Sequence, residues 1–245
     1  MDHRHGRRYV AAGIERLELT SPSGQPHEEG ILMKLDARRT AVLALHWLND
    51  IVTPQGAFGP FFAAMVEESG ALDRTSRLLE TARAHNVLVI YTRVCFRPGY
   101  ADLLANNPLL GMVAEKGALV DGENGAKIVD AITPQGDDLV IDHRRLTAFY
   151  GTELETLLRK RGIDTLLLTG VATNVTVEGT AREAVNQGYR TIVLADCCAA
   201  ATSAAHEASL ESLRLLAEVG SSSDAGAALT ASSPDPTASW PAENL

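Results

Sequence analysis

The chain has little positive charge. Its formal net charge is −9, and its only basic cluster is the N-terminal run HRHGRR. Nucleic-acid binding needs a basic face that neutralises phosphates. We therefore expect no nucleic-acid partner, and we interpret the basic run as a tail.

Cysteines and long apolar runs are scarce as well. Cys95, Cys197 and Cys198 form neither an even disulfide set nor a Cys-x-x-Cys metal pattern. They are interpreted as reduced thiols that fill a core or loop. No apolar run is long enough to cross a bilayer, and the N-terminus lacks the apolar stretch of a signal peptide. The sequence therefore predicts a cytoplasmic protein without a membrane partner.

The chain does have the composition of one globular domain. Hydrophobic residues make up 45% and charged residues 22% of its 245 residues. Its two ends show no sustained hydrophobic period. We expect residues 1–37 to form a loosely ordered N-terminal extension, residues 38–222 a single domain, and residues 223–245 a flexible C-terminal tail.

Short apolar runs alternate with amphipathic segments inside this domain. The runs typical of buried strands are 41–45, 87–94, 138–142, 165–170 and 191–196. The segments with helical spacing are 61–85, 154–161, 174–187 and 204–218. This succession predicts an α/β fold of three layers, α-β-α, with a mostly parallel, doubly wound, Rossmann-like sheet.

Candidate chemistry follows the predicted strands. Ligands of an open parallel sheet bind beyond the carboxyl ends of its strands. His46 follows the first strand, His143 the third, and Thr176 lies in the helix that starts after Gly170. A helix start offers free N–H groups and a positive dipole end to an oxyanion. The simpler interpretation is that Thr176 and its neighbours only cap the helix.

Three segments resemble the isochorismatase-like cysteine hydrolases, in the order found in that family. They are LALHWLNDIV, DLVIDHRRLTAFYGTELETLLRKRGIDTLLLTG and GVATNVTVEGTAREAVNQGYRTIVLADCCAA. In this resemblance His46 takes the place of the catalytic aspartate, His143 that of the lysine, and Thr176 that of the nucleophilic cysteine. All three catalytic residue types of the family are therefore replaced.

The resemblance implies a fold, a reaction class and a homo-oligomer. Members with the intact triad cleave amide and related C–N bonds of small molecules, and isochorismate-cleaving members hydrolyse a vinyl ether. It thus implies hydrolysis of a small polar or carboxylate-bearing molecule at an amide, ureido or enol-ether bond. It also implies a cis peptide bond between Val171 and Ala172, with the Ala172 N–H directed at a substrate oxygen.

The replacements retain acid–base chemistry. A neutral imidazole is a suitable base near pH 7, so either histidine can take the proton of the Thr176 hydroxyl. Alternatively, one histidine protonates a leaving group while the other activates water. Imidazoles also bind metal ions, but a convincing third ligand is missing. We expect no metal and no cofactor.

The competing hypothesis is an inactive family member that binds a metabolite or a protein partner. A single histidine is more often structural than catalytic. His46 and His143 both stand at positions that are charged in the resembled family, which favours an active site with different catalytic residues instead. Fold by itself does not decide between these functions.

Further residues near the strand ends are candidates for substrate binding. Aromatic side chains would form pocket walls or core, and arginines would bind a carboxylate or form surface ion pairs. Arg144 and Arg145 are expected to face solvent or a subunit contact. The predicted substrate-binding residues are Trp47, Arg93, Arg97, Phe149, Tyr150 and Asn174.

Overall fold

A six-stranded parallel sheet forms the centre of the protein. The computed structural model describes residues 33–232. The sheet order is β3-β2-β1-β4-β5-β6, and each neighbouring pair is parallel. The strands are β1 (Thr40–Leu45), β2 (Leu88–Val94), β3 (Leu139–His143), β4 (Thr165–Val171), β5 (Arg190–Ala199) and β6 (Glu218–Gly220). The predicted parallel, doubly wound sheet is confirmed.

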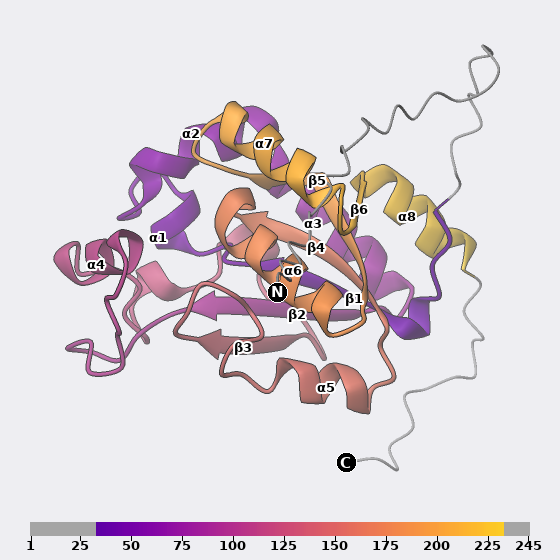
Figure 1. The fold of residues 1–245 in the computed structure, drawn as a ribbon, viewed down its shortest axis with the longest axis horizontal. Coiled ribbons are helices and arrows are strands. Elements are labelled where there is room, and N and C mark those ends of the chain that lie inside the picture. The colour runs from indigo at the N-terminus through magenta and orange to yellow at the C-terminus, as the bar shows by residue number, and fades with distance from the viewer. Residues whose placement is uncertain (1–32, 233–245) are drawn as a thin grey trace, which may run out of the picture. The chain divides into compact units, whose positions relative to one another are not determined.

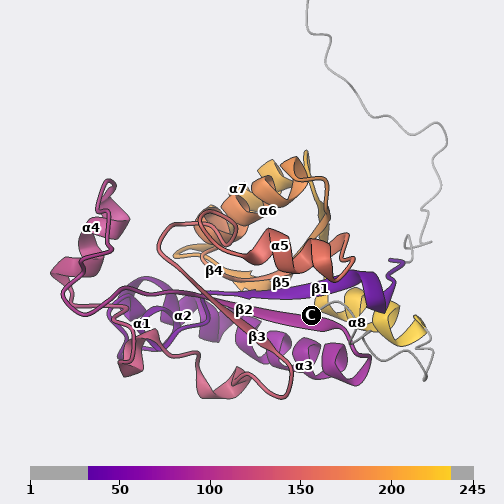
Figure 2. The same ribbon diagram turned by 90° about the horizontal axis from the view of Figure 1, so that it is seen from below.

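Helices cover both faces of the sheet. Figure 2 shows α5, α6 and α7 on one side and α1, α2, α3 and α8 on the other. The α-helices are α1 (Asn49–Val52), α2 (Gly59–Ser69), α3 (Ala71–Ala84), α4 (Pro108–Glu115), α5 (Leu154–Lys160), α6 (Glu178–Asn186), α7 (Ser203–Leu213) and α8 (Ser222–Ala231). Shorter turns are η1 (Ala37–Arg39), η2 (Asn124–Ala126), η3 (Asp130–Ile132) and the π-helical η4 (Thr173–Val177). Two apolar cores result, one on each side of the sheet.

The strand order reverses between β1 and β4. Every residue of these two strands is buried, which is typical of parallel strands covered on both faces. Leu45 at the end of β1 pairs with Gly170 on β4. The carboxyl ends of the strands point towards α1 and α4 (Figure 1). The crevice in which such folds bind ligands therefore lies at that end.

Two predicted helices differ from those observed. The predicted helix 61–85 is broken into α2 and α3 at Gly70, whose φ of 64° ends the first helix in the left-handed region. The predicted helix 204–218 ends at Leu213, and the chain then forms the edge strand β6. A strand of three residues is too short to show a period of two in the sequence.

Helix α8 lies within the stretch predicted as a C-terminal tail from residue 223. Ser221 caps it, and Ala225 and Leu229 are buried in the core beside α3. Residues 223–231 are thus helical and packed, because small alanine side chains bury a face with little sequence signal. The rest of that tail, from 233, and most of the predicted N-terminal extension, 1–32, lie outside the described residues.

No helix among residues 33–232 has both the length and the apolar character needed to cross a membrane.

Candidate active site

His46, His143 and Thr176 meet at the carboxyl end of the sheet. His46 follows β1, His143 ends β3, and Thr176 lies in η4 after β4. The Nε2 atoms of the two histidines are 2.8 Å apart, and Thr176 Oγ1 is 3.5 Å from His46 Nε2. The imidazole rings stack with centroids 4.8 Å apart. The structure thus brings together the three residues that the sequence predicted as catalytic.

Hydrogen bonds define the tautomers of this pair. His143 Nδ1 lies 3.0 Å from the carbonyl oxygen of Arg145, which only accepts, so Nδ1 carries the proton and donates. In the neutral ring, His143 Nε2 is then an acceptor. His46 Nε2 must therefore donate to it, which leaves His46 Nδ1 unprotonated. No hydrogen bond to that atom is formed within residues 33–232.

Both imidazoles are neutral near pH 7. Burial lowers the pKa of His46 well below 6.5, and the neighbouring His143 lowers it further. Burial also lowers the pKa of His143 to about 4, although the Arg145 carbonyl and Asp142 oppose the shift. The cause is the cost of holding a charged ring away from water.

His46 is held in an uncommon backbone conformation. Its φ is 58°, in the left-handed region that few residues other than glycine adopt, among which histidine is enriched. Its backbone N–H donates to the carbonyl of Thr92 on β2, and its carbonyl accepts from Leu48. The turn that ends β1 therefore fixes the position of the imidazole.

A second polar network holds the η4 turn that carries Thr176. The Thr173 hydroxyl lies 2.8 Å from His206 Nδ1 on α7. Ser209, also on α7, donates to the Thr173 carbonyl and to the Glu178 carboxylate. Sequence reasoning missed these contacts, because the partners are more than 30 positions away along the chain.

A pocket opens next to His46. It holds about 500 Å³ of empty space, its open mouth included, and reaches Val171, Ala172 and Val175. The Val171–Ala172 peptide bond is cis, as the resemblance implied. Every lining side chain other than those of His46 and Arg145 is apolar. Thr176 and His143 lie behind this surface, with 0% and 2% of their area exposed.

The pocket has walls from several elements. Phe62 comes from α2, Leu110 and Val113 come from α4, and Leu119 follows α4. The Asp50 carboxylate on α1 accepts from the Leu119 N–H at 2.7 Å and so fixes that wall. Asp50 is thus a structural carboxylate of the site.

The predicted aromatic and amide contacts lie outside this pocket. Trp47 is buried, and its Nε1 donates to Thr169, so it belongs to the core. Phe149 is buried in the core on the α5 side and packs against Tyr189. Tyr150 and Asn174 are exposed. Apolar side chains after the strands were as well suited to the core as to a pocket, which is why the sequence could not separate the two roles.

The two predicted arginine contacts lie outside the pocket as well. Arg93 forms a bidentate ion pair with Asp142, at 2.7 and 2.6 Å, and a third contact with Asp121. Arg97 is exposed. The guanidinium of Arg93 is thus already occupied by carboxylates of this chain.

The arginine that does line the pocket is Arg145, which was expected to face solvent or a subunit. It donates to the Leu104 carbonyl and to Asn106 Oδ1, in the segment before α4. Within residues 33–232 it forms no ion pair. Arg144, in contrast, is paired with Asp102.

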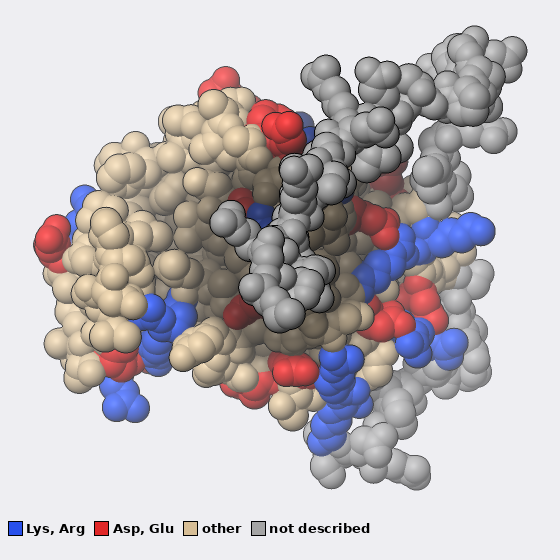
Figure 3. Space-filling view, viewed as in Figure 1, with Lys and Arg blue, Asp and Glu red and all other residues tan. Residues whose placement is uncertain are grey.

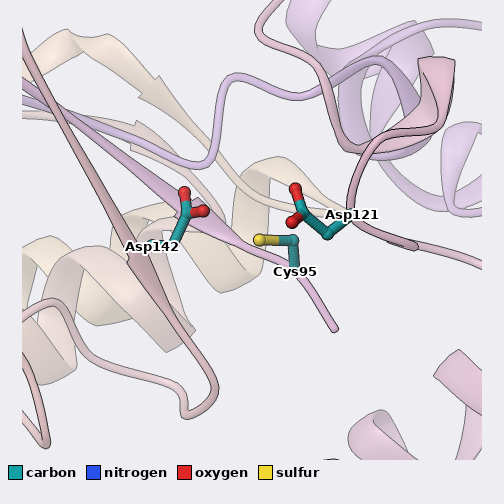
Figure 4. A group of neighbouring side chains, drawn as sticks. All are labelled: Cys95, Asp121 and Asp142. Atoms are coloured by element: carbon teal, nitrogen blue, oxygen red, sulfur yellow. The ribbon is translucent and has the colours of Figure 1, made fainter. Parts of the chain in front are cut away.

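Cys95, Asp121 and Asp142 form the cluster of possible metal ligands shown in Figure 4, with their ligand atoms within 4.8 Å of one another. The Arg93 guanidinium contacts both carboxylates of this cluster. Burial raises the pKa of the Cys95 thiol to about 11, whereas metal binding requires the thiolate. The positive charge at this cluster is supplied by arginine.

Comparisons with known proteins agree with this architecture. The Isochorismatase domain matches residues 40–224. An uncharacterized isochorismatase family protein of Bacillus subtilis, YwoC, is 32% identical over 179 residues, which span 73% of this chain and 87% of that protein. Maleamate amidohydrolase of Pseudomonas putida is 30% identical over 177 residues, 71% of this chain and 78% of that enzyme.

Solved structures show the same fold. The crystal structure of an isochorismatase family protein from Desulfovibrio vulgaris superposes with a TM-score of 0.71 and 28% identity, covering 79% of this chain and 99% of that one. Family match, relatives and fold agree, and the chain therefore belongs to the isochorismatase family.

Proposed function

We propose that this protein is a hydrolase that cleaves an amide or ureido C–N bond of a small molecule, with His46 as the general base. The observation that carries the proposal is the position of His46, which lines the pocket and is hydrogen-bonded to His143 at 2.8 Å. The relationship to an amidohydrolase, maleamate amidohydrolase, supports the reaction class.

In the proposed reaction water is the nucleophile. His46 Nδ1 takes a proton from water as the water oxygen bonds to the substrate carbonyl carbon. The resulting imidazolium returns that proton to the leaving nitrogen, and the C–N bond breaks to give an acid and an amine. His46 ends neutral, as it began.

His143 and Thr176 act through His46 in this scheme. The lone pair of His143 Nε2 accepts the His46 Nε2–H, which orients the ring and stabilises its positive charge once Nδ1 is protonated. Because His46 Nε2 carries a proton, it cannot take one from Thr176. The Thr176 hydroxyl, at 3.5 Å, is therefore proposed as a positioning group rather than as the nucleophile.

The oxyanion side of the proposed site is the stretch after β4. Val171 and Ala172 line the pocket, and the first turn of η4 follows at once. The first N–H groups of a helix have no partner within it and favour negative charge. They are the proposed donors to the carbonyl oxygen during attack.

An amide panel assayed for ammonia release tests this function. Wild type is compared with His46→Gln, His143→Gln and the control His85→Gln, at the C-cap of α3. We expect a fall of about 100-fold or more in kcat/KM for His46→Gln, a smaller fall for His143→Gln, and none for His85→Gln. Equal rates for wild type and His46→Gln would contradict the proposal.

A second candidate is a ligand-binding domain without catalysis. It is favoured by the burial of Thr176 and His143, whose polar atoms contact other groups of the protein rather than the pocket. On this hypothesis small molecules bind with measurable affinity, and no substrate of the panel is turned over above the background of His46→Gln. The same assay, joined to a binding measurement, separates the two functions.

We also propose a cytoplasmic homo-oligomer whose partner is a small molecule rather than nucleic acid. Acidic and basic side chains are interspersed on the face that Figure 3 shows, and the net charge is −9, so neither feature favours binding to phosphates. Light scattering of the purified protein tests the oligomer, and a single-subunit mass would contradict it.

A further inference from the structure

We infer that the pocket beside His46 takes an uncharged, apolar substrate body, such as an aromatic ring or a branched hydrocarbon, and discriminates against a carboxylate. The inference rests on the proposed function, because the bound molecule is a substrate only if the reaction occurs. The chemical class of that molecule rests on the pocket lining. This lining argues against the carboxylate-bearing molecule that was one of the substrates expected from the sequence.

The pocket wall supports this class. Phe62 of α2 and Leu110 and Val113 of α4 line the same pocket as His46. The surface of the pocket is formed almost entirely by carbon atoms. The nitrogen atoms of His46 and Arg145 make up only a small part of that surface. An apolar group that binds there leaves water without losing any hydrogen bond. A carboxylate would lose its hydrogen bonds to water, and an apolar wall offers it none in return.

Arg145 is the residue that a carboxylate would need. Its guanidinium donates to Leu104 and Asn106, at 3.0 and 2.9 Å, and so binds the segment before α4 to the turn after β3. The side chain therefore presents its hydrocarbon stem to the pocket while its nitrogen atoms hold the chain. The other candidate arginine, Arg93, is held by Asp142.

The pocket lining combines an apolar wall with the proposed base. Its apolar side chains come from several elements, and His46 belongs to the same lining. The lining also includes Val171 and Ala172, at the end of β4. An aromatic amide can thus place its ring against α2 and α4 and its carbonyl carbon near His46.

A matched ligand pair tests the inference by calorimetry or ligand-observed NMR on the full chain. Benzamide and 4-carbamoylbenzoate differ by one carboxylate. We expect wild type to bind benzamide with a Kd at least about tenfold lower. Leu109→Asn, at a half-buried lining position on α4, should weaken benzamide binding, whereas Leu216→Asn, at an exposed leucine outside the pocket, should not.

Equal or tighter binding of the anion, or no binding of either compound, would overturn the inference. Ammonia release is measured in the same samples. If benzamide binds as expected but is not hydrolysed, the proposed reaction fails while the ligand class stands. If the anion is bound more tightly and hydrolysed, the reaction stands and the ligand class fails.

Discussion

The Nε2 atoms of His46 and His143 lie 2.8 Å apart, although 97 positions separate the two residues in the chain. Parallel strands bring them together, since both follow or end a strand at the same edge of the sheet. The Arg145 carbonyl assigns the proton of His143 to Nδ1, and the rest of the tautomer pattern follows from it. One backbone oxygen thus determines which nitrogen of His46 is basic.

Stability should fall as the pH is lowered from about 7 to about 4. The pKa of His143 is about 4 in the folded protein and 6.5 in the unfolded chain, so the unfolded chain binds more protons between these values. The free energy of unfolding should therefore fall over this range, and the lowered pKa of His46 acts in the same direction. Urea unfolding at several pH values measures it.

The control for this prediction removes the titrating pair. A His46→Asn/His143→Asn double variant should show a flatter dependence of stability on pH between 6.5 and 4, and His85→Asn should keep that of wild type. A double variant with the wild-type slope would show that other groups cause the acid sensitivity.

Arg93 should contribute to the stability of the folded protein and not to its ligand affinity. Arg93→Gln removes the bidentate partner of Asp142 and leaves two neighbouring carboxylates without it, so we expect a loss of about 2 kcal/mol. The Kd for benzamide should stay unchanged, because Arg93 does not line the pocket. Arg97→Gln, at an exposed arginine, is the control. A large change of Kd with intact stability would make Arg93 a ligand contact.

Gly170 should tolerate no side chain. A Cβ there would lie 2.3 Å from the Leu45 carbonyl oxygen, and its φ is +147°. We expect Gly170→Ala to cost about 3 kcal/mol or more, because it pushes β4 from β1 where the site is formed. Gly226→Ala, on α8 with open space around it, should stay within about 1 kcal/mol of wild type. Thermal unfolding compares the two, and similar midpoints would contradict the close packing at Gly170.

The cysteines should be unreactive in the folded protein. Cys95, Cys197 and Cys198 are buried, and burial raises the pKa of Cys95 and Cys197 to about 11 and that of Cys198 well above 9. Because the thiolate is the reactive form, N-ethylmaleimide at pH 7.5 should add no mass to the native chain and three adducts in guanidinium. A native adduct accompanied by loss of turnover would point to a thiol in the site.

The fold was readable from the sequence where the pattern was long. The runs at β1, β2, β4 and β5 are mainly apolar, and their alternation with helical segments predicts the parallel sheet. The break at Gly70 and the strand β6 were not predicted. The break depends on the left-handed conformation of Gly70, and β6 depends on its pairing with β5. Neither feature leaves a periodic signal in the sequence.

The site was only partly readable. His46, His143 and Thr176 were placed together by the strand-end argument, but the sequence could not assign the proton on each ring, which depends on the Arg145 carbonyl. Part of the pocket wall comes from α2 and α4, which are separate in the sequence from those strand ends. A side chain such as Leu110 becomes a ligand contact only through tertiary packing.

The proposed reaction requires neutral His46 with an unprotonated Nδ1. Nitrogen-15 NMR of the imidazoles at pH 7 locates the proton on each ring, with His46→Gln and His143→Gln used to assign the signals. We expect His143 to carry its proton on Nδ1 and His46 to carry its proton on Nε2. A His46 ring protonated at Nδ1 at that pH would contradict the proposed reaction, because that nitrogen could not then act as the base.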